Sequence, residues 1–301
     1  MNFGTIRKAL SDGPDYMEGR MYRDGKWARQ LIALQHDDGS WGRFHSMATR
    51  GDSPVTTEQA LRRLRILGYT IEDECIRRAV DYMDGCLCGR NEIPDPREKL
   101  HNWDLFTALM LSARIREFTL DNPNANRVAG QWAKVVSHAL SGGSYSHERY
   151  AEAYAGVFGL KPRGGRLVDF TGFYQISLLQ DQLDENEQYA LMDYLLPKQD
   201  GMYYIYDRPL NRPPEFSSRR AVAYLGAMEI LAGYRYGRRK LEFVAGWLEE
   251  NRNENGGWDM GAQAKDGVYF PLSDDWRRKS VREADCTYRI NALLSRLKQK
   301  G

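Results

Sequence analysis

A short helix followed by a glycine-tryptophan turn occurs twice in this chain, and this repeat constrains the fold more than any other feature of the sequence. The first copy is WARQLIALQHDDGSWG (27–42) and the second is WLEENRNENGGW (247–258). Their spacing is the same, and the aligned pairs are Leu31 with Leu248, Gln35 with Arg252, Gly39 with Gly256 and Trp41 with Trp258. A looser copy, YLLPKQDGMY (194–203), has Tyr203 in place of the tryptophan. Internal repeats of this kind indicate a fold built from copies of one supersecondary unit.

The turn of each repeat has the residues needed to end a helix. An Asp-Gly or Asn-Gly pair precedes the tryptophan, and glycine takes the left-handed conformation that closes a helix end. The tryptophan is expected to fold back over that end, with its ring N–H bonded. We therefore interpret Gln35, Trp41 and Trp258 as structural residues. Trp276 lies in a polar loop and is expected to contribute less to stability.

Helices of two textures alternate along the chain. One kind has a single apolar stripe, which is typical of an outer helix, and the other is apolar nearly all round, which indicates burial on both sides. The predicted outer helices are 27–36, 73–85, 126–140, 186–197 and 239–251, and the predicted inner helices are 57–67, 103–115, 169–183, 219–233 and 285–297. Five outer-inner pairs predict an all-α fold, an α/α toroid, as one domain over residues 1–301. Residues 1–25 are weakly patterned, and whether they supply a sixth pair is open.

The repeat resembles the QW repeat of squalene and hopene cyclases and, more broadly, the α/α-toroid superfamily that includes protein prenyltransferase β subunits. This resemblance implies a barrel of inner helices wrapped by outer ones, with a central cavity that binds an isoprenoid. Aromatic residues make up 12% of the chain, and aromatic faces attract apolar and cationic ligands. Trp103 and Tyr174, on two predicted inner helices, are expected to line the cavity and contact the ligand.

Composition removes several classes of function. The 43 Lys and Arg against 41 Asp and Glu give a net charge of +2, which gives no reason to expect nucleic acid as a partner. No apolar run approaches the length of a transmembrane helix, the mean hydropathy is −0.64, and the N-terminus lacks a signal-peptide core. Four cysteines make no disulfide framework in a chain of 301 residues. These observations predict a cytoplasmic protein.

Most of the predicted inner helices carry a carboxylate near their start, namely Glu58, Asp104, Asp169 and Asp285. Acids in a first turn complement the helix dipole and cap free N–H groups, which is the structural interpretation. In a toroid, however, all inner helices begin at one end, so these carboxylates would ring one mouth of the barrel and could hold a proton. Asp275 beside Asp274 is a further candidate acid, because repulsion between like charges raises a carboxyl pKa.

The segment RRKSVREADCTYRI (277–290) resembles a run in protein prenyltransferase β subunits: basic, basic, Asp, Cys and Tyr at fixed spacing. The resemblance implies that Lys279, Arg282 and Tyr288 contact a diphosphate, with Asp285 nearby. Thr287 stands where the family has its zinc-binding thiolate, so we predict neither a metal site nor a cofactor. Arg219 and Arg220, which open a predicted inner helix, are further candidates for the same anion, because a helix N-terminus favours negative charge.

The predicted function is the binding, with or without conversion, of an isoprenoid or similar apolar ligand with an anionic head. The acid motifs Asp-x-Asp-Asp and Asp-Asp-x-x-Asp of terpenoid enzymes are absent from the sequence, so any lyase, transferase or isomerase chemistry would run without them. Two alternatives stay open. One is a carbohydrate-active α/α-barrel enzyme, a glycosidase or lyase with two carboxylates flanking the bond. The other is a non-catalytic toroid scaffold.

Overall fold

The computed structural model describes residues 22–45, 53–99, 102–162 and 169–299, and over these ranges the chain is all-α. Two isolated bridges, Gly172 with Tyr203 and Met202 with Tyr206, are the β-pairings among the described residues. The possible sixth pair at 1–25 lies almost wholly outside these ranges. The helices are α3 (Lys26–Ala33), α4 (Thr57–Ile66), α5 (Glu74–Leu87), α6 (Trp103–Arg116), α7 (Pro123–Leu140), α8 (His147–Phe158), α9 (Phe173–Leu178), α10 (Glu185–Leu195), α11 (Arg219–Leu231), the 3-10 helix η2 (Gly237–Leu241), α12 (Glu242–Glu250) and α13 (Lys279–Lys298).

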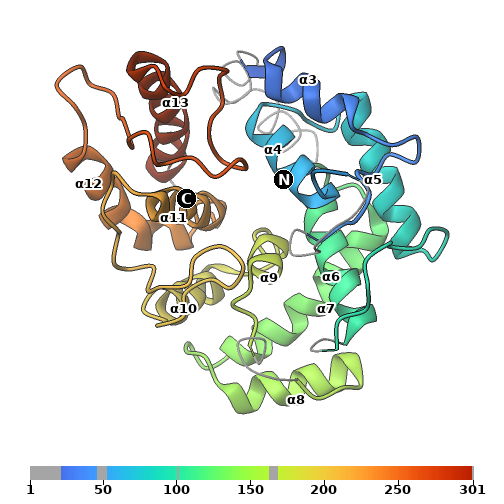
Figure 1. The fold of residues 1–301 in the computed structure, drawn as a ribbon. Helices are drawn as coiled ribbons and strands as arrows, with labels where there is room; N and C mark the ends of the chain where they lie inside the picture. Colours follow the sequence, from blue (N-terminus) through green and yellow to red (C-terminus); the bar gives the residue numbers. More distant parts are fainter. Residues whose placement is uncertain (1–21, 46–52, 100–101, 163–168, 300–301) are drawn as a thin grey trace.

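The helices follow one another around the molecule in the order of the sequence (Figure 1). Residues 261–278, which we call the closing connection, follow the second repeat, lead into α13 and reach back to the first helices. The ring N–H of Trp27 in α3 donates to the Ser273 carbonyl at 3.0 Å, and Arg63 in α4 donates to the Val268 carbonyl at 3.1 Å. The last described part of the chain is therefore joined to the first. A closed toroid remains a prediction that this order favours.

The two textures seen in the sequence correspond to two degrees of burial. All six residues of α9, nine of fourteen in α6 and nine of thirteen in α11 are buried, whereas α3 and α12 each bury two. The buried helices α6, α9 and α11 contact one another in turn, and the less buried α5, α7 and α10 do so as well. This is the pairing expected of an inner and an outer layer. None of the described helices is long and apolar enough to cross a membrane.

The two strong repeats have nearly identical geometry. The ring N–H of Trp41 donates to the Leu31 carbonyl at 2.7 Å, and that of Trp258 donates to the Leu248 carbonyl at 2.7 Å. Both tryptophans are fully buried, and Gly39 (φ 91°) and Gly256 (φ 79°) have the left-handed conformation predicted for the turns. The aligned residues also agree: Gln35 donates to the Gly39 carbonyl and Arg252 to the Gly256 carbonyl. The interpretation of these residues as structural ties is supported.

Several details differ from the sequence-based expectation. Helix α9 begins at Phe173 and has six residues, because Asp169 and Thr171 form a turn closed by side-chain bonds before it. Helix α13 begins at Lys279, six residues earlier than predicted, and α8 was not predicted. Tyr203 does not repeat the tryptophan tie, since its backbone pairs with the segment before α9. Trp276 is buried (6% exposed) and bonds the Ala262 carbonyl, so its expected minor role is wrong.

Candidate functional site

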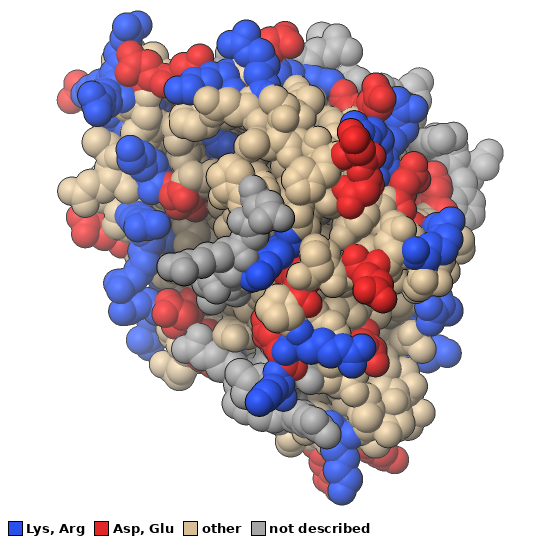
Figure 2. Space-filling view, turned by 45° about the vertical axis from the view of Figure 1, so that its right-hand side comes forward, with Lys and Arg blue, Asp and Glu red and all other residues tan. Residues whose placement is uncertain are grey.

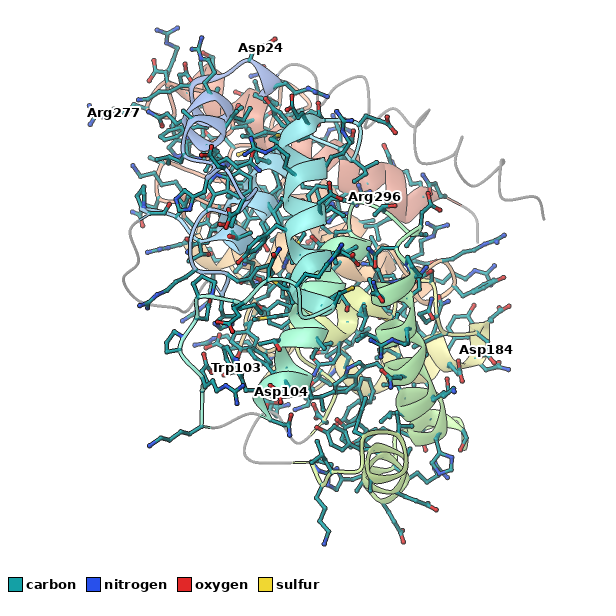
Figure 3. All side chains as sticks on the ribbon, turned by 90° about the vertical axis from the view of Figure 1, so that its right-hand side faces the viewer. Asp24, Trp103, Asp104, Asp184, Arg277 and Arg296 are labelled. Atoms are coloured by element: carbon teal, nitrogen blue, oxygen red, sulfur yellow. The ribbon has the colours of Figure 1, made fainter. Side chains whose placement is uncertain are left out.

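The four carboxylates proposed as catalytic groups have different surroundings, and their arrangement around one mouth of the fold stays a prediction. Asp104 is exposed, with its nearest cation, the exposed Arg97, at 3.7 Å; Figure 3 shows it beside Trp103, far from Arg277 just before α13. Asp275 is half exposed and pairs with Arg278. Asp169 accepts bonds from Thr171 and Tyr194 and pairs with Lys198, and Asp285 lies at the closing connection.

Asp285 is a structural carboxylate, although it is buried in the way a catalytic acid would be. Its Oδ2 accepts the backbone N–H of Leu272 (2.9 Å) and both the N–H and the hydroxyl of Ser273 (3.0 and 2.9 Å). The second oxygen, Oδ1, has no hydrogen-bond partner in the described part of the chain. Tyr22 lies beside it, and burial followed by this negative charge raises the pKa of the Tyr22 phenol. The carboxylate therefore fastens the closing connection to α13.

The basic residues predicted to bind a diphosphate differ in their exposure and in their partners. Arg282 is buried and forms a two-pronged pair with Asp259, at 2.6 and 2.7 Å, so its guanidinium is already occupied. Lys279 and the pair Arg219 and Arg220 are exposed at the starts of α13 and α11. Tyr288 is partly buried and packs edge-on against Tyr22. Figure 2 shows acidic side chains lying among the basic ones on the face it presents. Arg282 is thus bound to a carboxylate of the chain, and an anion site at these residues stays a prediction.

Charged residues instead converge where the inner helices face one another. We call this set the inner-helix charge cluster: Glu58, Arg62 and Arg65 of α4, Arg114 and its neighbour Glu117 at the end of α6, Glu229 of α11 and Arg289 of α13. Arg114 bonds Glu58 at 3.1 Å and Glu117 at 2.6 Å. Arg289 bonds Glu229 at 2.6 Å. The partner of Glu229 thus comes from α13.

Arg65 has charged residues from three other helices near it and is nevertheless accessible to water. Surrounding protein displaces water and lowers the pKa of the Arg65 guanidinium, and the charges nearest to it are Glu117, Arg296, Arg114 and Glu229, from α6, α13 and α11. Yet 44% of the side-chain surface stays accessible, and its nearest carboxylate is Glu117 at 3.9 Å. Arg65 is therefore an exposed cation at the edge of the cluster.

Arg62 is another cation of the cluster without a close carboxylate, and aromatic side chains hold it. Its guanidinium lies 5.1 Å from the ring centres of both Phe173 and Tyr269 and donates to the Tyr269 hydroxyl at 2.5 Å. Burial alone would lower its pKa, but Tyr269 and Glu58 outweigh that cost and raise the pKa. No carboxylate of the described residues lies within ion-pair distance of Arg62. Cations set against ring faces in this way are attracted by the ring quadrupole.

The cluster also has donors without acceptors. The Nε–H of Arg114 and one terminal nitrogen, Nη1, of Arg289 are buried and have no partner among the residues that the structure describes. Four arginines face three glutamates in the cluster, so one positive charge is in excess. Tyr174, predicted to line the cavity, lies beside it: burial, then the Glu58 carboxylate, raises the pKa of its phenol well above the usual value. The arrangement can hold an anion and offers it several N–H groups.

The sequence shows one sign of this charge cluster. The predicted inner helix TEQALRRLRI has three arginines, and a charged run on a helix expected to be buried requires partners. The spacing of apolar residues in this segment predicts only a more polar inner helix. Within the described ranges, no group of three His, Cys, Asp or Glu residues is placed to hold a metal. Scans against protein-family models, curated proteins and solved structures found no match for this chain.

Proposed function

We propose that this protein binds a small ligand with an anionic head and an apolar body, such as an isoprenoid diphosphate, in the space bordered by the inner-helix charge cluster. The proposal rests on the lack of a close carboxylate at Arg62 and at Arg65. Arg62 is largely enclosed by protein and has no carboxylate partner among the described residues, and the exposed Arg65 has only a distant one. Enclosed cations without close counter-charges favour an external anion.

The apolar body would lie against the aromatic side chains that continue from the cluster. Phe173 and Tyr269 present ring faces to Arg62, and Phe106, Tyr174 and Tyr204 pack against one another nearby. In this proposal the anionic head binds arginines of the inner helices instead of Lys279 and Arg282. The class of ligand is the one that the repeat suggested.

Isothermal titration with farnesyl diphosphate tests the proposal. Replacing Arg65 by Gln should weaken binding by about 10- to 100-fold, the scale of one charge-assisted hydrogen bond. The apo protein should keep its stability, because Glu117 retains its closer bond to Arg114. Lys279→Gln is the matched control: it removes an exposed cation of the region proposed from the sequence and should leave the affinity unchanged. Loss of affinity in Lys279→Gln but not in Arg65→Gln would refute this site.

A carbohydrate ligand is the second candidate, because Phe173 and Tyr269 could also stack on a sugar ring. Glycoside hydrolysis requires one carboxylic acid and one carboxylate flanking the bond. In the cluster, Glu58 and Glu117 are both bound to Arg114, which does not favour that pair of roles. Binding of acidic oligosaccharides with no response to farnesyl diphosphate would support this candidate. No response to either would favour the scaffold.

A further inference from the structure

His45 is a buried side chain whose position is fixed but whose ring is unsatisfied. It is 1% exposed, and its backbone N–H and that of Phe44 donate to the two oxygens of Asp95 at 2.8 and 2.6 Å. Neither ring nitrogen has a hydrogen-bond partner among the described residues. The Glu98 carboxylate lies 3.7 Å from Nδ1, which is beyond hydrogen-bond reach. A buried imidazole always has at least one N–H to donate, so leaving both nitrogens unmet is costly.

Three aromatic rings form the walls around this imidazole. Phe106 of α6 and Tyr204 meet it edge to face, at 5.5 and 5.3 Å between ring centres, and Tyr174 of α9 lies at 6.1 Å. Apolar ring edges cannot satisfy the two nitrogens. Apart from the Glu98 carboxylate, the described surroundings of this imidazole are those of an uncharged aromatic residue.

Tyr204 supplies an independent observation at the same place. With φ of 73° it is the sole residue other than glycine with a left-handed backbone in the part of the chain that the structure describes. A tyrosine is strained in this conformation, and strained residues gather at ligand sites. Its ring packs against the His45 ring, so the strained backbone and the unpaired ring nitrogens lie at the same place in the fold.

This feature is continuous with the inner-helix charge cluster. Tyr174 touches the imidazole on one side, and its hydroxyl lies by Glu58 on the other. Glu58 bonds Arg114, whose guanidinium lies 4.3 Å from the ring centre of Phe173, the same ring that Arg62 approaches. A ligand held at Arg62 and Arg65 with its body along these rings would reach His45.

We propose that His45 hydrogen-bonds a hydroxyl or carbonyl group of the ligand, and that Glu98 positions the imidazole from its Nδ1 side. The inference rests on the proposed function and narrows it. The ligand has an anionic head at one end, a hydrogen-bonding oxygen at the other and an apolar body between them, so an unfunctionalised isoprenoid chain meets only part of the site.

The first test needs no ligand. Replacing His45 by Phe should raise the melting temperature of the apo protein by about 2 to 6 °C, because the unmet nitrogens disappear while the shape is kept. His45→Leu, which guards against crowding by the larger ring, should not lower it. His138→Phe, at an exposed histidine, is the control and should have little effect. A lower melting temperature in both His45 variants would overturn the proposal, since it would show that the imidazole stabilises the fold.

The second test compares geranyl diphosphate with 8-hydroxygeranyl diphosphate by isothermal titration. The wild type should bind the hydroxylated probe at least fivefold more tightly, and His45→Phe should lose this preference while still binding geranyl diphosphate. Equal affinity of the wild type for both probes, or a preference that survives in His45→Phe, would overturn the role of His45 alone. A wild type that binds neither probe would overturn the proposed function and this inference with it.

Discussion

Two threonines hold the repeat tryptophans in the same way. The backbone N–H of Trp41 donates to the Thr57 hydroxyl at 2.9 Å, and that of Trp258 donates to the Thr287 hydroxyl at 3.0 Å. Each threonine belongs to the helix that follows its repeat. Thr287 therefore has a structural role of its own: it is the acceptor that ties a turn to helix α13.

Replacing these threonines by valine keeps the shape and removes the acceptor. Thr57→Val should destabilise the protein by about 1 to 3 kcal/mol, because it leaves a buried N–H unpaired. Thr287→Val should cost less, since its bond to Trp258 is only partly buried. Urea melts of the two variants measure the difference. Equal and negligible costs would contradict the role given to the hydroxyls.

The pair of Arg282 and Asp259 gives a stability that depends on pH. Burial opposes ionisation of Asp259, but Arg282 and the Gly261 N–H outweigh it and hold the pKa of this carboxyl below its usual value. A depressed folded-state pKa stabilises the protein above the unfolded carboxyl pKa of about 4, and that contribution is lost as the pH falls through the folded-state pKa.

Arg282→Gln should therefore lower apo stability by about 2 to 3 kcal/mol near neutral pH, because it leaves the Asp259 carboxylate without its guanidinium partner. The gap to the wild type should be constant between about pH 5 and 8 and shrink below about pH 4. Denaturant melts across this range provide the measurement. Arg278→Gln, which removes a cation paired only at the exposed surface, is the control and should give no such gap.

At the scale of elements, Asp285 fastens the closing connection to α13. Three bonds from Leu272 and Ser273 end on one carboxylate oxygen of α13. On the other side, Lys26 at the start of α3 donates its backbone N–H to Asp274 at 3.1 Å. One loop thereby joins the first and last described helices.

Asp285→Ala should release this loop. We expect a loss of about 3 kcal/mol in stability, because buried N–H groups lose a charged acceptor, and faster tryptic cleavage at Arg277 and Arg278, which are exposed within the loop. Limited proteolysis followed by mass spectrometry locates the cuts. Asp275→Ala, at an exposed neighbour, should not change the cleavage rate; if it matches Asp285→Ala, the fastening role is refuted.

Periodicity predicted the elements well, because burial on one or two faces is written in the spacing of apolar residues. It predicted α4, α6 and α11 within one or two residues at either end. It missed the start of α13, because the charged residues Lys279 and Arg282 are typical of a loop. The partner that buries Arg282, Asp259, lies 23 positions away and cannot be inferred from periodicity. His45 could not be found at all: its isolation comes from Phe106, Tyr174 and Tyr204, residues 61 or more positions away.

For the whole molecule, we expect one cooperative unit. The described helices share a single hydrophobic core, and the closing connection links its first and last parts. Thermal unfolding should show one transition by calorimetry, and a chain of 301 residues folded as one compact domain should have a radius of gyration of about 19 Å. Two separated transitions, or a clearly larger radius in solution scattering, would indicate two domains instead of the single predicted one.

The link between Arg63 and Val268 spans 205 positions of sequence. A ribosome adding about 5 to 20 residues per second needs about 10 to 40 s to synthesise that interval. During this time α3 and α4 are complete but the segment that covers them does not exist. The apolar side chains of α4 and the rings around Arg62 are then exposed to other nascent chains. The yield of folded protein should therefore depend more on chaperones that protect this N-terminal intermediate than on the stability of the finished fold.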